Sequence, residues 1–386
     1  MKGWYWRVAA ISAVVGLAGC KQDASRLEVL DKPEATLNRR FQQVSNVVEL
    51  TDGRIALAEL KDKAFFFADF KTGDATPIGT HADTILPNDP GLGKHKLPGY
   101  VFHLMGDTVG LVDFATERTT LWNEQGQYLG RLMVGGVGGH NMAVNYDDKG
   151  NAYKEDIRSV LGGLEPGQEV GLDSLAVIRI PRGDTIADTV ARLRLPPWGR
   201  GQFGMQVRIV STIFAPRDIF GVLPDGSMWL ARASNNAVDW RSPTGQFSRG
   251  PSRSYTKIPV EGQERDDFMR RLRLQMAHMG APAGIELTYP FADQKAPFTT
   301  GLTNPAGQVW LERARAFGDS VPVWDVVGRD GKEIEAVQLP KAASLAGFGK
   351  DGKVYVILRE AGGLESLARY ALRMSGTGTA SVAAVP

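Results

Sequence analysis

The chain has 386 residues, of which 43% are hydrophobic, so it can bury a large core as one big domain or two smaller ones. Its 45 glycines suit a turn-rich all-β protein, and its formal net charge is +2. Without Lys2 and Arg7, which fall in a segment that we expect to be removed, 43 basic residues balance the 43 acidic ones. This balance, with no basic stripe, excludes the usual nucleic-acid-binding protein.

The first twenty residues have the pattern of a secretion signal. Two basic residues are followed by the uncharged run Val8–Gly19, which is too short for a membrane span of roughly 20 residues. The run ends in Leu17-Ala-Gly-Cys20, which resembles the lipobox of bacterial lipoproteins. The resemblance implies that residues 1–20 are a signal peptide. It also implies that Cys20 becomes a lipidated N-terminus, which anchors the exported protein to the membrane of the cell envelope.

Cys20 is the only cysteine in the sequence, so we expect no internal disulfide. Lys21 follows it, where an aspartate would resemble an inner-membrane retention signal, and this favours the outer membrane. Residues 21–40 are polar and predict a tether, although Leu27–Leu30 could add a strand. We expect residues 41–386 to form the folded domain, and we expect it to be a monomer.

From Phe41 onward, apolar residues alternate with a period of two, which predicts β-strands separated by turns. A first kind of turn recurs six times, at Asp52-Gly53, Gly106-Asp107, Lys149-Gly150, Asp225-Gly226, Ala306-Gly307 and Asp351-Gly352. A second turn follows each of them, at Thr72-Gly73, Gln125-Gly126, Arg182-Gly183, Thr244-Gly245, Asp330-Gly331 and Ser375-Gly376. We expect two-residue hairpin loops at these sites, because such loops demand the positive φ that Asn, Asp and Gly tolerate.

Two hairpins in each of six units predict four antiparallel strands per unit, which is typical of a propeller blade. We therefore predict an all-β fold, a six-bladed β-propeller of four-stranded antiparallel blades with one helical insertion. A β-sandwich or barrel is the alternative, but it would not explain six paired turns in register. Two ways of closing the ring are open: a C-terminal strand that begins at Gly376, or the N-terminal segment Leu27–Leu30 acting as a latch.

The helical insertion is expected at about residues 262–280. Phe268, Leu272, Met276 and Met279 fall on one face of this helix, with acidic residues at its start and basic ones later. The apolar face either packs on the rim of the propeller or forms a lid or docking element over one mouth.

Three aromatic residues, Trp229, Trp310 and Tyr355, share one position just after the first turn of their units. This repetition indicates that they pack between blades, because large aromatic side chains dominate core energetics. Trp198 breaks the pattern, in Leu195-Pro-Pro-Trp-Gly-Arg200. We therefore select Trp198 and Arg200 as candidate surface contact residues.

Two segments carry a family resemblance. Pro297–Leu311, followed by Pro322–Gly331, resembles a blade of the six-bladed propeller lipoproteins of diderm soil bacteria, and Gly250–Tyr255 is similar to the same group. More distantly, the units resemble NHL repeats and the TolB-like propeller group. The resemblance implies the fold, and it implies no particular activity.

Propellers bind ligands where the inner strands converge on the axis. Counting back from each first turn places six polar residues near that mouth: Asn46, Tyr100, Asn141, Asp218, Thr299 and Ser344. His103 and His140 lie close to them in the sequence. No motif for a catalytic triad, a zinc site or a phosphate-binding loop is present, so we predict no catalytic residue and no cofactor. The alternative is a Ca²⁺ ion held by Glu49, Asn141 and Asp218, since Ca²⁺ takes oxygen ligands.

Two hypotheses follow from these observations. The first is a lipid-anchored module that binds or scaffolds an envelope protein, a peptide or a small ligand. The second is a hydrolase or lyase that uses a divalent cation in the central channel, which would resemble the lactonases of the senescence-marker and paraoxonase type.

Overall fold

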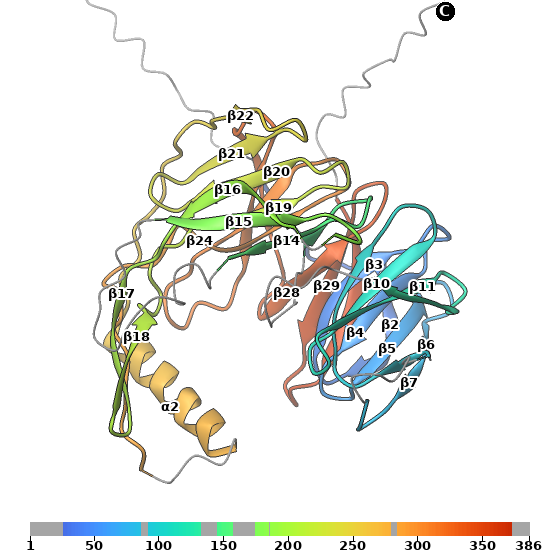
Figure 1. The fold of residues 1–386 in the computed structure, drawn as a ribbon, viewed down its shortest axis with the longest axis horizontal. Helices are drawn as coiled ribbons and strands as arrows, with labels where there is room; N and C mark the ends of the chain where they lie inside the picture. Colours follow the sequence, from blue (N-terminus) through green and yellow to red (C-terminus); the bar gives the residue numbers. More distant parts are fainter. Residues whose placement is uncertain are drawn as a thin grey trace, which may run out of the picture.

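The computed structural model describes residues 26–85, 92–132, 145–156, 174–184, 186–278 and 284–372. Nearly all regular structure in these ranges is β-strand, and the one α-helix among them is α2 (Gly262–His278). No helix in the described ranges has the length and apolar character needed to cross a membrane. Figure 1 shows the strands gathered into separate sheets, with α2 beside a hairpin that projects from them.

Six sheets follow one another along the chain, each with four antiparallel strands in the described residues. Sheet 1 holds β3 (Val44–Glu49), β4 (Ile55–Glu59), β5 (Ala64–Asp69) and β6 (Asp74–Pro77). Sheet 2 holds β9 (Pro98–His103), β10 (Thr108–Asp113), β11 (Arg118–Asn123) and β12 (Tyr128–Leu132). Sheet 3 holds β13 (Asn145–Tyr146), β14 (Ala152–Glu155), β15 (Ser174–Ile180) and β16 (Asp188–Arg194).

The other three sheets come from the second half of the chain and from its N-terminal strands. Sheet 4 holds β19 (Ile219–Val222), β20 (Met228–Arg232), β21 (Ala237–Arg241) and β22 (Phe247–Ser248). Sheet 5 holds β24 (Phe298–Thr303), β25 (Val309–Arg313), β26 (Val323–Val327) and β27 (Glu333–Gln338), and β1 (Arg26–Val29) joins it parallel to β27. Sheet 6 holds β28 (Ala343–Phe348), β29 (Lys353–Arg359), β30 (Glu365–Ala371) and β2 (Ala35–Phe41).

The last sheet is completed by a strand from the other end of the chain. Strand β2 pairs antiparallel with β30, so that Phe41 lies opposite Glu365. The Glu365 carboxylate also accepts a hydrogen bond of 2.7 Å from the Val44 backbone N–H, which ties sheet 6 to sheet 1. The strand considered at Leu27–Leu30 is present as β1, whereas the polar tether expected over residues 21–40 is wrong for Ala35–Phe41, which forms β2. Gly376, the alternative start of a closing strand, lies outside the described residues.

The first turns are three-residue loops, which corrects the expected two-residue loops. In sheet 4 the Leu223 N–H donates to the Ser227 carbonyl at 2.8 Å, and the Gly226 N–H donates to the Leu223 carbonyl at 2.9 Å. Gly226 has a φ of +82°, so the loop is a type I turn followed by a left-handed residue. The Asp225 carboxylate accepts a hydrogen bond from the Ser227 N–H at 2.8 Å, which explains why an acidic residue precedes the glycine.

Large aromatic side chains fill the interfaces between neighbouring sheets. Trp229 of sheet 4 is 1% exposed, packs with Phe298 and Leu311 of sheet 5, and donates its indole N–H to Thr303 at 2.6 Å. Its ring lies so close to Gly221 and Gly301 that a Cβ there would come within 2.5 and 2.6 Å of it. Trp310 lies in the corresponding interface between sheets 5 and 6, and Tyr355 lies in the one between sheets 6 and 1. The predicted packing between blades is therefore confirmed.

Six apolar clusters of this kind join each sheet to the next and the last to the first. The first strands of all six sheets line one central cavity of about 910 Å³. Sheets arranged in a closed ring around a common axis define a β-propeller. The chain is therefore an all-β protein with a propeller fold and one described helix.

Further strands lie outside the six sheets. Between sheets 3 and 4 the chain forms the hairpin β17 (Trp198–Phe203) and β18 (Gln206–Ser211), and β17 also pairs with β23 (Leu287–Thr288). Phe268 of α2 contacts Phe214 and Phe291 at ring-centroid distances of 5.8 and 5.7 Å. We call β17, β18, β23 and α2 the insert lobe. A short parallel pair, β7 (Thr80–His81) and β8 (Lys94–His95), precedes sheet 2.

The predicted helix is confirmed at Gly262–His278, and Phe268 on its apolar face packs against Phe214, Tyr289 and Phe291, which flank β18 and β23. Phe268, Leu272 and Met276 are half-buried, whereas Met279 lies outside the described residues.

Candidate functional site

The central cavity is lined by three of the residues predicted at the channel mouth, Asn46, Tyr100 and Ser344, and by the nearby His103. The Asn46 amide donates to the Val101 carbonyl at 2.7 Å and accepts from the Val101 N–H at 3.0 Å, so it joins β3 to β9. Burial raises the pKa of Tyr100, which keeps its hydroxyl protonated. His140 and Asn141 lie outside the described residues.

Asp218 is 4% exposed and is not among the described residues that line the central cavity. One carboxylate oxygen accepts hydrogen bonds from the Arg194 N–H and from the Arg232 guanidinium, both at 3.0 Å. The other accepts from the Ala233 N–H at 3.0 Å. Both oxygens are thus occupied by groups that join β16, β19 and the end of β20.

Glu49 lines the central cavity, but its carboxylate already has a close partner. The Tyr355 hydroxyl donates to Glu49 at 2.5 Å, and burial, together with this hydrogen bond to the carboxylate, raises the pKa of Tyr355. In the described part of the chain, no group of three or more His, Cys, Asp or Glu side chains could hold a metal ion. Because Asn141 lies outside that part, the Ca²⁺ site of Glu49, Asn141 and Asp218 stays a prediction.

A second cavity, of about 380 Å³, lies where the insert lobe meets sheets 3 and 5. We call it the hairpin cavity. It brings together Trp198 and Thr299, which the sequence selected for different reasons. Most of its wall is apolar, and its apolar lining residues are Leu175, Leu195, Pro196, Trp198, Ile213, Phe214, Ala215, Ala296, Phe298 and Ala314. A mainly apolar cavity with a few polar groups is the usual form of a small-molecule site.

Trp198 has an indole N–H that is shielded from solvent and finds no acceptor among the described residues. Trp310 and Trp324 share this property, but they are 0% and 2% exposed. Trp198 is only half-buried and packs on Leu175 and Leu195 at the cavity wall. A buried donor without an acceptor costs about 1–3 kcal/mol, so an acceptor at this place would be favourable.

The charged groups of the hairpin cavity are paired within the protein. Arg217 contacts Glu155 at 2.5 Å. Lys295 contacts Glu264 of α2 at 2.6 Å and also donates to the Arg315 carbonyl at 2.6 Å. These pairs neutralise the charges at the wall, so the cavity as a whole favours an uncharged occupant.

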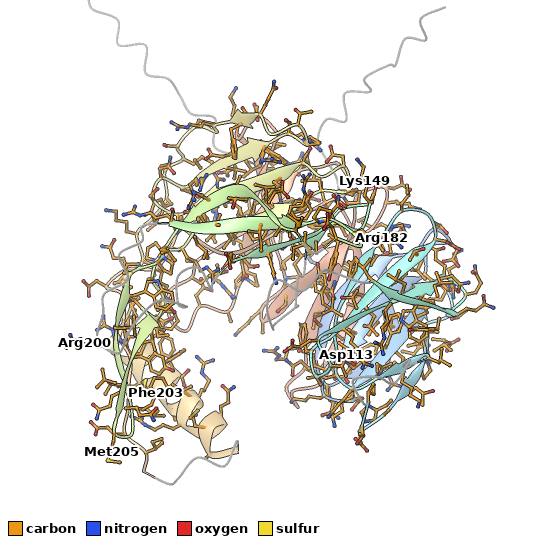
Figure 2. All side chains as sticks on the ribbon, viewed as in Figure 1. Asp113, Lys149, Arg182, Arg200, Phe203 and Met205 are labelled. Atoms are coloured by element: carbon orange, nitrogen blue, oxygen red, sulfur yellow. The ribbon has the colours of Figure 1, made fainter. Side chains whose placement is uncertain are left out.

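Two further candidates are placed as follows. The Thr299 hydroxyl, at the cavity wall, donates to Glu312 at 3.2 Å. Arg200 is exposed on β17 and is not among the described residues that line the hairpin cavity. Figure 2 shows Arg200, Phe203 and Met205 on the hairpin that projects from the sheets, and Met205 is fully exposed at its tip.

The sequence analysis missed the hairpin β17–β18 and with it Phe214, Arg217 and Lys295. A signal was present: Phe203 lies opposite Gln206, so Gly204-Met205 is a two-residue loop, and Gly204 has a φ of +60°. Gly at the first position of such a loop is a known hairpin signature.

Comparisons with known proteins add the following. No family model matches the chain, and no curated protein matches its sequence. Among similar solved structures is the calcium-binding protein regucalcin from Agrobacterium tumefaciens, at 10% identity over 89% of this chain and 95% of that one, with a TM-score of 0.41. A gluconolactonase from Xanthomonas campestris is 11% identical over 90% and 97%, with a TM-score of 0.39. Virginiamycin B lyase from Staphylococcus aureus is 8% identical over 89% of each chain, with a TM-score of 0.38. Values this low say nothing about what this chain binds or catalyses.

Proposed function

We propose that this protein is an exported β-propeller, anchored to the cell envelope by a lipid on Cys20, that binds a ligand in the hairpin cavity. In this proposal the six sheets are the blades of a six-bladed ring, the protein works as a monomer, and the lipid places it on the outer membrane. The observation that carries the proposal is the solvent-shielded N–H of Trp198, which has no acceptor among the described residues and belongs to a side chain at the wall of an apolar cavity.

The cavity wall specifies the chemistry of the occupant. The ring of Trp198, together with Phe214 and Phe298, offers apolar surface to an apolar or aromatic group. The Trp198 N–H calls for one hydrogen-bond acceptor, such as a carbonyl or ether oxygen. Because the wall charges are already paired, the ligand is expected to be uncharged. A small molecule fits this description, and so does an apolar side chain with its backbone carbonyl, presented by an envelope protein or peptide.

The alternative of a cation-dependent hydrolase or lyase receives no support from the described residues. The carboxylates proposed for it, Glu49 and Asp218, have close hydrogen-bond partners within the protein. A cation would have to displace the Arg232 guanidinium from Asp218, which is unfavourable for both charges.

The proposal is tested with two probes of matched shape, acetophenone, which carries a carbonyl acceptor, and ethylbenzene, which does not. Binding is followed by the indole N–H resonances of the protein labelled with ¹⁵N-tryptophan, and the Trp198→Phe variant assigns the resonance of Trp198. We expect acetophenone to shift this resonance, and Trp198→Phe to weaken its binding about threefold to tenfold, the loss of one hydrogen bond.

The matched control is Trp240→Phe, because the Trp240 N–H already donates to the Gly328 carbonyl, at 3.3 Å, away from the cavity. This variant should bind acetophenone as the parent protein does, and ethylbenzene should bind all three proteins equally. If neither probe perturbs the Trp198 resonance, or if both variants lose affinity alike, the hairpin cavity is not the binding site.

A further inference from the structure

Strand β1 fixes where the N-terminal segment enters the propeller. It runs parallel to β27, with Arg26 opposite Glu335 and Val29 opposite Gln338. Strand β27 begins at Glu333, directly after the second turn of sheet 5. In a four-stranded antiparallel meander the first and second turns lie at the same end of the sheet. We call this the turn end of the propeller, and residue 26 is reached from it.

The chain between the lipid and the fold is short. Only residues 21–25 separate Cys20 from Arg26. Even fully extended, such a segment spans about 20 Å at roughly 3.5 Å per residue. If Cys20 carries the lipid, as the proposed function holds, the turn end of sheet 5 lies within about 20 Å of the bilayer surface. This distance is short because most of the expected 20-residue tether is part of the fold, as strands β1 and β2.

The hairpin cavity lies at the opposite end of the sheets, which we call the insert end. Its wall includes Glu155, the last residue of β14, and Phe298, the first residue of β24. Strand β14 begins just after a first turn and β24 ends just before one, so both residues lie at the end of the strand that is far from the turns. Figure 2 shows Lys149 and Arg182, which lie in a first and a second turn, on the other side of the molecule from Met205 at the hairpin tip.

We propose that the turn end rests on the lipid bilayer, and that the hairpin cavity and the insert lobe face away from it. The exposed surface of the turn end supports a bilayer as its partner. Met105, in the turn between β9 and β10 of sheet 2, is 70% exposed, and the first turns of sheets 4 and 5 expose Pro224 and Pro305. The first turns expose both acidic and basic residues, such as Asp107 and Lys350, and a surface of mixed charge is compatible with electrically neutral zwitterionic headgroups.

This orientation has a functional consequence that rests on the proposed binding module. A ligand or partner would reach the cavity from the aqueous side of the envelope, and the lipid surface would not cover the cavity mouth. The insert lobe, with its exposed tip, would be the part of the protein that is presented to other molecules.

The orientation is tested by energy transfer on the full lipidated chain in phosphatidylcholine vesicles that contain a headgroup-labelled acceptor lipid. The lipid occupies the thiol of Cys20, the only native cysteine, so one introduced cysteine takes the donor dye selectively. Met105→Cys and Met205→Cys are a matched pair, because both methionines are exposed turn residues at opposite ends. Asp330→Cys, in the turn before β27, is the positive control for a site beside the anchor.

We expect the dye at position 105 to lose clearly more donor emission to the membrane acceptor than the dye at position 205, with position 330 at least as strongly affected as 105. Equal transfer from positions 105 and 205, or stronger transfer from 205, overturns the orientation while the anchor stands, provided that the protein floats with the vesicles. A chain that does not float with vesicles, and that gives no transfer at any position, refutes the lipid anchor and with it the orientation. Acetophenone binding in the hairpin cavity is measured separately, so its failure is distinguishable from both.

Discussion

The ring of sheets and the insert lobe differ in how their side chains are buried and hydrogen-bonded. In the ring, Trp229 is 1% exposed and its indole N–H is bound to Thr303, while the buried Asp218 carboxylate has three hydrogen-bond donors around it. In the insert lobe, Phe268 is half-buried, Met205 is fully exposed and the Trp198 N–H lacks an acceptor among the described residues. The polar groups of Trp229 and Asp218 are thus occupied inside the ring, whereas the N–H of Trp198, at the wall of the hairpin cavity, has a contact left to offer a ligand.

The largest expected effect comes from removing a side chain between two sheets. Trp229→Ala empties the interface of sheets 4 and 5, and we expect it to lower the free energy of unfolding by about 3–5 kcal/mol. The flanking residues Gly221 and Gly301 cannot fill the space, because they have no side chains. Urea denaturation followed by circular dichroism measures the change.

Phe268→Ala in the insert lobe is the counterpart of this substitution. Its ring packs against Phe214, Tyr289 and Phe291 but is only half-buried, so we expect a smaller loss of about 1–2 kcal/mol. Limited proteolysis should show faster cleavage of the insertion, with little change in the main unfolding transition. If both substitutions shift the main transition equally, the lobe and the ring unfold as one unit and the comparison fails.

An effect second only to that of Trp229→Ala is expected at Asp218. Asp218→Ala leaves the Arg232 guanidinium without one of its two carboxylates and exposes two backbone N–H groups to an apolar gap, which should cost about 3 kcal/mol. Asp218→Asn is the conservative control. It should lose less stability than Asp218→Ala, because its amide keeps one acceptor oxygen. The measurement is again urea denaturation.

The same two variants decide between a structural and a ligand-binding role for Asp218. If Asp218→Asn keeps the stability of the parent protein but abolishes acetophenone binding, Asp218 has a role in ligand binding. If stability falls and binding persists, its carboxylate serves to hold the strands of sheets 3 and 4 together.

The fold was predictable because its signals are local and repeated. Each first turn has a glycine with positive φ, such as Gly226, and three of the following strands place an aromatic side chain at the same distance, Trp229, Trp310 and Tyr355. These patterns lie within short windows of sequence, so six weak signals support one another. The helix was predictable for the same reason, from the spacing of Phe268, Leu272 and Met276.

The closing strand and the hairpin cavity were not predictable in this way. Strand β2 has a polar sequence because much of it is exposed, and its partner β30 lies at the other end of the chain. The hairpin cavity depends on segments as distant as Glu155, Trp198 and Phe298. Asp218 looked like a ligand because the sequence shows its charge, whereas the backbone N–H groups that occupy the carboxylate become visible only in the fold.

The smallest effect is expected from calcium. This experiment tests whether Glu49, Asn141 and Asp218 form a cation site. Because Glu49 and Asp218 are already hydrogen-bonded, we expect the thermal midpoint to be the same with excess Ca²⁺ and with a chelator. A resident ion at 100 times its Kd would stabilise the protein by about 2.7 kcal/mol, so a site would be easy to detect by calorimetry. A raised midpoint in Ca²⁺ that is lost in Asn141→Ala but kept in Trp198→Phe would place a cation site in the ring. The division between a structural ring and a binding insertion would then be wrong.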